Sequence, residues 1–202
     1  TKGFYKPTFE EQDKSYGCSA LTDGSIFGRN FDWEDSPVMI VKSEPKNGYA
    51  SYSTVCLEFL GFYDGWTLDG SIMDKFMALA AVYVPLDGMN EKGLCIADLL
   101  VINTPETHQK TDKPDLTTVG ALRMVLDHAT SVDEAVALIE GIDMNSSIGS
   151  NHHYAISDRS GKSVAVEWVD NKMYVTETSA VANNIVRKEV SEGTGTEESW
   201  KR

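Results

Sequence analysis

The sequence has few basic residues, and this shortage excludes the most strongly anionic partners. Its 202 residues hold 18 lysines and arginines against 31 aspartates and glutamates, which gives a formal net charge of −13. A protein with that charge repels phosphate backbones and anionic lipid surfaces at long range. We therefore expect binding neither to nucleic acid nor to a membrane surface.

Long hydrophobic runs and zinc-type cysteine spacings are also missing. No apolar run approaches the roughly 20 residues that span a bilayer, and the N-terminus is too polar for a signal-peptide core. The three cysteines, Cys18, Cys56 and Cys95, are an odd number without CxxC spacing, which argues against a disulfide framework and a structural metal. His152 and His153 would point to opposite faces of a strand, where they cannot share one ion. The sequence predicts a soluble protein with a free thiol and leaves its compartment, cytoplasmic or secreted, open.

The order of local patterns indicates the fold class. With 41% hydrophobic residues and no linker-like stretch, the chain suits one domain. An Asp23-Gly24 turn predicts a hairpin, and a Ser131–Glu134 capping box opens a helix that stops at Gly141. The order of strands, helices and strands favours a layered protein with antiparallel sheets. Predicted strands cover 18–22, 25–31, 38–42, 50–59, 93–102, 153–157, 163–168 and 173–176; a helix covers 116–129; and 75–84 fits helix or buried strand.

A cysteine, an arginine and an aspartate come together in the first predicted hairpin. Cys18 heads the first strand, and Arg29 and Asp32 lie near the end of the partner strand, close enough to approach it. Lone cysteines are more often small buried residues than nucleophiles. An exposed Arg–Asp pair can also be a plain ion pair, worth about 0 to 1 kcal/mol. The spacing alone leaves a catalytic and a structural role open.

Four blocks in order carry a family resemblance. Cys-Ser followed by FGRNFDW, then GMNEKGLCIADL at 88–99, HHYAISDRSGKSVAVEW at 152–168 and VANN at 181–184, resemble the linear amide C-N hydrolases of the choloylglycine hydrolase family. This family belongs to the N-terminal nucleophile (Ntn) superfamily and contains bile salt hydrolases, penicillin V acylase and acyl-CoA:6-aminopenicillanic acid acyltransferase. The resemblance implies an α+β fold, an αββα sandwich with two antiparallel sheets between helical layers.

The resemblance also implies that Cys18 is a nucleophile whose own α-amino group is the base. That amine exists only after self-cleavage between Gly17 and Cys18, so residues 1–17 would be a propeptide or leader. The domain would be 18–202, and it would be C-terminally incomplete, since family members run well past this length. A free α-amine titrates near 7.7 to 8.0, whereas a lysine amine titrates near 10.4, so the amine is suited to take a proton at neutral pH.

Other site residues follow from the same resemblance. A guanidinium at Arg29 would favour the thiolate of Cys18, and Asp32 could hold the amine by a charge-assisted hydrogen bond. The motif points to Asn183 as oxyanion donor, although a threonine that relatives carry just before it is an alanine here. Leu100 aligns where bile salt hydrolases have an asparagine, which leaves a backbone N–H as the second donor. Arg202 aligns with a catalytic-site arginine.

The expected activity is hydrolysis of a non-peptide linear amide, of the N-acyl amide, bile-salt or penicillin V type, through an S-acyl-cysteine. This mechanism requires no cofactor, and the partner is a small-molecule N-acyl amide; homo-oligomerisation stays open. The alternatives are acyl transfer to an amine and a catalytically silent module that binds amphipathic amides. Asn90 and Glu91 fit a tight turn, and their recurrence in the family leaves a role in the substrate pocket open.

Overall fold

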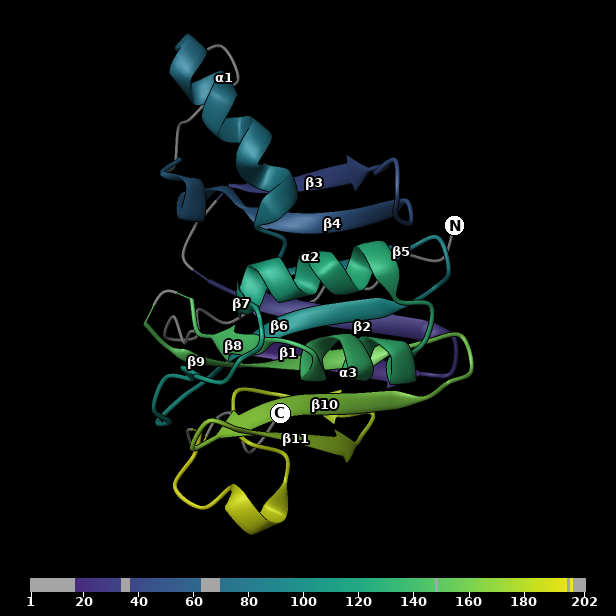
Figure 1. The fold of residues 1–202 in the computed structure, drawn as a ribbon, viewed down its shortest axis with the longest axis vertical. Helices are drawn as coiled ribbons and strands as arrows, with labels where there is room; N and C mark the ends of the chain where they lie inside the picture. The colour runs from purple at the N-terminus through teal and green to yellow at the C-terminus, as the bar shows by residue number, and fades with distance from the viewer. Residues whose placement is uncertain (1–16, 34–36, 63–69, 148, 196, 198–202) are drawn as a thin grey trace, which may run out of the picture.

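Two antiparallel sheets dominate the computed structural model, which describes residues 17–33, 37–62, 70–147, 149–195 and 197 (Figure 1). The predicted leader up to residue 16 and Arg202 lie outside these ranges. The small sheet has the order β12-β1-β2, and the large one the order β11-β10-β9-β6-β5-β4-β3. The small sheet consists of β1 (Gly17–Asp23), β2 (Ile26–Asp32) and β12 (Ala180–Val181). The large sheet consists of β3 (Val38–Ser43), β4 (Ser51–Cys56), β5 (Asp87–Asn90), β6 (Cys95–Val101), β9 (Asn151–Ser157), β10 (Ser163–Val169) and β11 (Lys172–Glu177).

Two helices cover one face of the large sheet. They are α2 (Thr118–His128) and α3 (Val132–Glu140), which lie in front of the strands in Figure 1. Their apolar stripes pack with alternate residues of β6, β9 and β10 into the main core, whose largest members are fully buried. This core includes Leu122, Leu126, Ile139, Ile96, Tyr154 and Trp168. A short parallel pair, β7 (Asp115–Thr117) and β8 (Asp143–Asn145), lies beside the helices.

The other face of the large sheet packs against the small sheet through small side chains. Cys18 and Ala20 of β1 form one cluster with Ala97, Ala155 and Ala165 of the large sheet. Alanines leave little between the two backbones, so the head of β1 lies close to the middle of the large sheet. The predicted α+β class with two stacked antiparallel sheets is confirmed, and in the described residues α2 and α3 form the helical layer that covers the large sheet.

Several boundaries differ from the sequence predictions. The hairpin turn is Gly24-Ser25 rather than Asp23-Gly24, because Asp23 pairs with Ile26, and Gly24 takes the positive φ of 56° that the first turn position requires. The strand predicted over 50–59 ends at Cys56, and Leu57–Leu60 forms a 3-10 helix. Segment 75–84 is helical, in α1 (Ile72–Leu79) and the 3-10 turn Ala80–Tyr83.

The capping box of α3 is only half formed. The Ser131 side chain accepts a hydrogen bond from the Glu134 N–H, as predicted. The Glu134 carboxylate, however, accepts from the backbone and hydroxyl of Thr130 instead of returning to Ser131. These bonds lower the pKa of Glu134. The helix still begins after Ser131 and ends at Gly141, as the pattern predicted.

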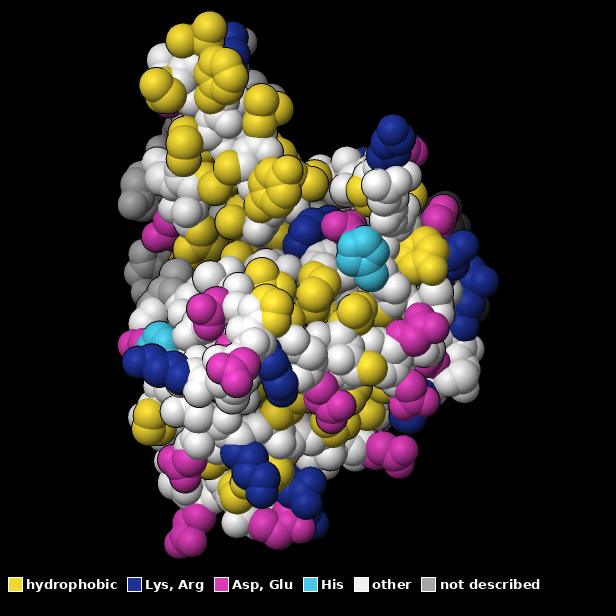
Figure 2. Space-filling view, viewed as in Figure 1, with side chains coloured by type: hydrophobic (Ala, Val, Ile, Leu, Met, Phe, Trp, Pro, Cys, Tyr) yellow, Lys and Arg dark blue, Asp and Glu magenta, His cyan; other side chains and the backbone are white. Residues whose placement is uncertain are grey.

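Helix α1 extends from the body at the top of Figures 1 and 2, with apolar side chains along it. It contains no buried residue, and Ile72, Met73, Phe76 and Leu79 are all exposed. Its start is held by a complete capping box between Ser71 and Asp74. Its other end packs on the body through Ala78, which contacts the cluster of Val55, Leu57, Phe62 and Ala81. None of the helices in the described ranges is long and apolar enough to cross a membrane.

Candidate active site

Cys18 lies at the start of the hairpin between the two sheets. The register pairs Cys18 with Phe31 and Gly17 with Asp32, so a two-residue turn is enough to place the ends of β1 and β2 together. The thiol is 4% exposed and free. Its neighbour Ala20 pairs with Arg29, and side chains of directly paired residues share one face of the sheet. The hairpin alone thus directs the thiol and the guanidinium toward the large sheet.

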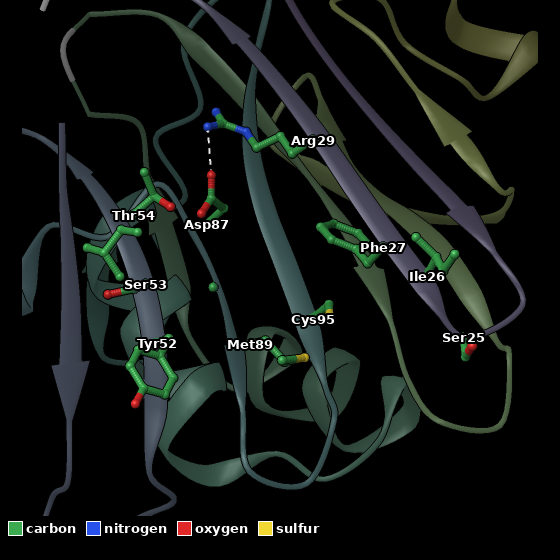
Figure 3. A pocket seen from close by; sticks show the side chains of 12 residues that line it. Ser25, Ile26, Phe27, Arg29, Tyr52, Ser53, Thr54, Asp87, Met89 and Cys95 are labelled. Carbon is green, nitrogen blue, oxygen red and sulfur yellow. Dashed lines mark hydrogen bonds and ion pairs between the residues drawn. The ribbon is translucent and has the colours of Figure 1, made fainter. Parts of the chain in front are cut away.

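Arg29 is held beside the thiol by two contacts with the large sheet. Its Nη1 makes an ion pair with Asp87 Oδ2 at 2.8 Å, at one end of the cleft drawn in Figure 3. Its Nη2 donates to the Asp98 carbonyl at 2.8 Å and lies 3.9 Å from Cys18 Sγ. The guanidinium also lies over the Phe31 ring, 4.6 Å from its centroid. These contacts fix the positive charge next to the sulfur.

Asn183 reaches the same point from the segment after β12. Its Oδ1 accepts a hydrogen bond from the backbone nitrogen of Cys18 at 2.5 Å, and its Nδ2 donates to the Leu100 carbonyl at 2.8 Å. The side chain is 3% exposed. Pairing of β12 with β1, Ala20 opposite Val181, brings this distant segment alongside the cysteine. The structure therefore unites Cys18, Arg29 and Asn183, three of the five residues predicted for the site.

The environment of Cys18 contains opposing electrostatic effects. Burial raises the pKa of the thiol, Arg29 lowers it and the Asp98 carboxylate raises it, and hydrogen bonds from the Asn183 side chain and the Leu100 backbone lower it. The net result is a raised pKa. At Cys95, burial raises the pKa of the thiol to about 11 despite a hydrogen bond with Ser157. The thiol form of Cys18 is therefore favoured over the thiolate near neutral pH.

Asp32 and Arg202 are the other two residues predicted for the site. Asp32 lies opposite Gly17, one position from Cys18, and its Oδ1 accepts a hydrogen bond from Asn30 Nδ2 at 2.7 Å. It therefore lies next to the peptide bond that the sequence predicts to be cut. Arg202 lies outside the described residues, so its role stays a prediction.

Three paired acids of the large sheet, the buried Asp98 and Glu167 and the half-buried Asp87, escaped the sequence prediction. Asp87 pairs with Arg29; Asp98 binds His152 Nδ1 through both oxygens, at 3.0 and 2.9 Å; and Glu167 binds His153 Nδ1 at 3.1 Å. The two histidines do point to opposite sides of β9, as predicted. For Asp98 and Glu167 the available signal was an acid inside an otherwise apolar strand, because buried carboxylates are almost always paired.

No cluster of metal-ligating side chains occurs in the described part of the chain. A cleft of about 590 Å³ lies beside the site, lined by Phe27, Ile40, Tyr52, Met89 and Cys95 with the Arg29–Asp87 pair at one end (Figure 3). Cys18 does not line it. Arg29, which does line the cleft, lies 3.9 Å from Cys18 Sγ.

Most of the chain is similar to known proteins. Residues 18–185 match the family model of the linear amide C-N hydrolases, choloylglycine hydrolase family. A penicillin V acylase from Pectobacterium atrosepticum is 29% identical over 168 residues, covering 76% of this chain and 43% of that protein.

Two solved structures show the same fold. A cysteine-to-alanine mutant of the conjugated bile acid hydrolase from Clostridium perfringens has a TM-score of 0.54 at 21% identity, covering 81% of this chain and 52% of that one. An arginine-to-leucine variant of that enzyme has a TM-score of 0.52 at 20% identity, covering 82% and 52%. The chain thus spans about half the length of these relatives. Since the family match covers most of its residues, the chain belongs to the choloylglycine hydrolase family of linear amide C-N hydrolases.

Proposed function

We propose that this chain carries the nucleophile of an amidohydrolase that cleaves a non-peptide linear amide through an S-acyl-cysteine at Cys18. The observation that carries the proposal is the convergence of Cys18, Arg29 and Asn183 within a family of linear amide hydrolases. Penicillin V is the first substrate to test, because the 29% identical relative is named a penicillin V acylase. A conjugated bile acid is the second, after the named activity of the similar structures.

The first step would be cleavage of the chain itself. With Gly17 attached, the nitrogen of Cys18 is an amide that donates its proton to Asn183 Oδ1 and has no basic lone pair. Attack of Sγ on the Gly17 carbonyl would move the acyl group from nitrogen to sulfur, and water would release it as a carboxylic acid. Cys18 would then hold a free α-amine. The start of the family match at residue 18 supports this junction.

The amine would serve as the base for the second reaction. Because burial leaves the Cys18 pKa raised, the thiol needs a proton acceptor, and an α-amine near 7.7 to 8.0 can act without a histidine. Arg29 would stabilise the thiolate as it forms. Asp32, one position away, would hold the amine in the orientation that reaches Sγ.

The tetrahedral intermediate requires donors that are fixed before the reaction. Asn183 Nδ2 spends one of its two protons on the Leu100 carbonyl, which leaves the other for an oxyanion. The Leu100 N–H, which lowers the pKa of the Cys18 thiol, is the backbone donor that the sequence predicted in place of an asparagine. Each such donor contributes roughly 3 kcal/mol to catalysis in comparable sites.

Intact-mass analysis and turnover together test the proposal. Active wild-type protein should have the mass of a chain that begins at Cys18. The Cys18→Ala variant should keep residues 1–17 and should not turn over penicillin V or conjugated bile acids. Cys56→Ser is the matched control, because Cys56 is a buried free thiol that does not line the cleft, and it should leave the cleavage and the turnover unchanged. An active enzyme that still carries Gly17 would refute the mechanism. Products formed only with an added amine would indicate acyl transfer, and binding without turnover would indicate the silent module.

A further inference from the structure

Glu167 is a fully buried carboxylate in the layer between the two sheets. It lies two residues after Ala165 on β10, and Ala165 belongs to the cluster that surrounds Cys18, so both side chains point to the same face. Glu167 Oε1 accepts from the Val186 N–H at 2.7 Å and from His153 Nδ1 at 3.1 Å. Its Oε2 accepts from the Arg187 N–H at 3.1 Å. Three donors thus compensate one buried charge.

Two of these donors lie in the segment that carries Asn183. Between β12 and the 3-10 turn Lys188–Val190 the chain forms no strand or helix, so no sheet ladder binds its backbone groups. The Asn183 carbonyl accepts from the Ile102 N–H at 3.3 Å, and the Ile185 N–H donates to Thr194 Oγ1 at 3.1 Å. The Glu167 carboxylate binds this segment at Val186, three residues beyond Asn183, and at Arg187.

The geometry at Cys18 depends on where this segment lies. Asn183 uses both ends of its amide, toward the Cys18 nitrogen and toward the Leu100 carbonyl, so a shift of its Cα weakens both bonds. Misplacement of a catalytic group by about 1 Å can cost on the order of 100-fold in rate. A contact that fixes Val186, three residues away, therefore affects the position of Asn183 and with it the rate of the reaction.

We propose that Glu167, supported by His153, is a positioning residue that holds Asn183 in place against Cys18. The inference rests on the proposed function only for its effect on catalysis; its effect on the Asn183–Cys18 hydrogen bond does not require activity. A carboxylate can accept all three N–H groups, whereas the amide of a glutamine would place its own NH2 against at least one of them. Glu167→Gln thus changes hydrogen bonding while keeping size.

Amide hydrogen exchange tests the hydrogen bond itself. In the full chain with Cys18→Ala, which keeps the amide at position 18, Glu167→Gln should speed exchange at residues 18, 186 and 187 by about tenfold or more, equivalent to ~1.4 kcal/mol. Amides of α2 should be unaffected. Tyr154→Phe is the matched control, because it removes another buried hydrogen bond, to the Thr118 carbonyl, from the opposite face of the same sheet. Faster exchange at 186 and 187 with no change at 18 would overturn the proposal.

A double-mutant cycle tests the consequence for catalysis. Glu167→Gln should lower kcat about tenfold or more with little change in KM, and it should add no further loss in an Asn183→Ala background. Tyr154→Phe should leave kcat near wild type. If the losses in kcat from Glu167→Gln and Asn183→Ala multiply in the double variant, Glu167 does not act through Asn183 and the proposal is overturned. If the wild type turns over no amide at all, the proposed function fails while the exchange experiment still decides the role of Glu167.

Discussion

Removal of the Arg29 charge should make Cys18 a much poorer nucleophile. At the 3.9 Å between Nη2 and Sγ, attraction between the guanidinium and a thiolate is on the order of 4 kcal/mol at an effective dielectric constant of 20. The ion pair with Asp87 weakens the field of the guanidinium, so the net effect is smaller. We expect a loss of about 1.4 to 4 kcal/mol, which is about a 10- to 1000-fold lower thiolate population at fixed pH.

The perturbation must not leave an acid unpaired beside the site. Arg29→Gln alone would strip the half-buried Asp87 of its partner, and this would cost stability, although less than the roughly 3 to 5 kcal/mol typical of a fully buried pair. The double variant Arg29→Gln/Asp87→Asn replaces the ion pair with two neutral amides, so neither partner keeps an unpaired charge. Asp87→Asn alone is the control, because it retains the guanidinium beside Cys18.

The rate of alkylation of Cys18 by iodoacetamide, followed by peptide mapping from pH 6 to 10, reports the thiolate directly. In the double variant the midpoint should move to higher pH, since Arg29 lowers the pKa of this thiol. The Asp87→Asn control should not show that upward movement. Circular dichroism establishes that both variants are folded. An unchanged midpoint in a folded double variant would refute the assignment of Arg29 as the group that stabilises the thiolate.

Two further predictions concern buried polar groups near the site. Burial lowers the pKa of His152, but the Asp98 carboxylate outweighs it and raises the pKa above its usual value. The stabilisation from this pair should therefore be complete below about pH 6.5 and be lost as pH rises through the raised pKa. The free energy of unfolding, measured with urea, should fall over that pH range, and His152→Gln should remove the decrease. An equal decrease in the variant would contradict this. Asn90 donates to the Leu126 and Ala129 carbonyls and accepts from the Lys92 and Leu94 N–H groups. Asn90→Ala should thus lower the free energy of unfolding by about 2 to 4 kcal/mol without changing KM; a raised KM at unchanged stability would instead assign Asn90 to the substrate pocket.

The part of the site that lies within one hairpin was predictable from sequence. A two-residue turn fixes the register, and the register sets Arg29 opposite Ala20 and Asp32 opposite Gly17. Even a one-residue error in the turn position left this proximity intact, because the paired ends of β1 and β2 stay together. The helices followed from periodicity for the same reason, that local spacing determines which face is buried.

The contacts that cross between sheets were not predictable in this way. Asp87 is 58 residues from Arg29, and Asn183 is 165 residues from Cys18. Their meeting depends on strand order, in which β12 lies beside β1, and on the stacking of the small sheet over β6. Periodicity reports burial but not the partner across a layer. Asn183 was found only because the family motif supplied the information that local physics lacks.

Net charge says little about this site, although it is the most conspicuous property of the sequence. A chain of charge −13 would be expected to disfavour a thiolate, and Asp98 does so. Yet three acids near the site are each matched by a specific donor: Asp87 by Arg29, Asp98 by His152, and Glu167 by His153 and two backbone N–H groups. Once the acids are paired, donors at fixed positions affect Cys18 more than the long-range field of the net charge does. In the proposed mechanism, holding Asn183 and Arg29 in place is therefore as important as their identity.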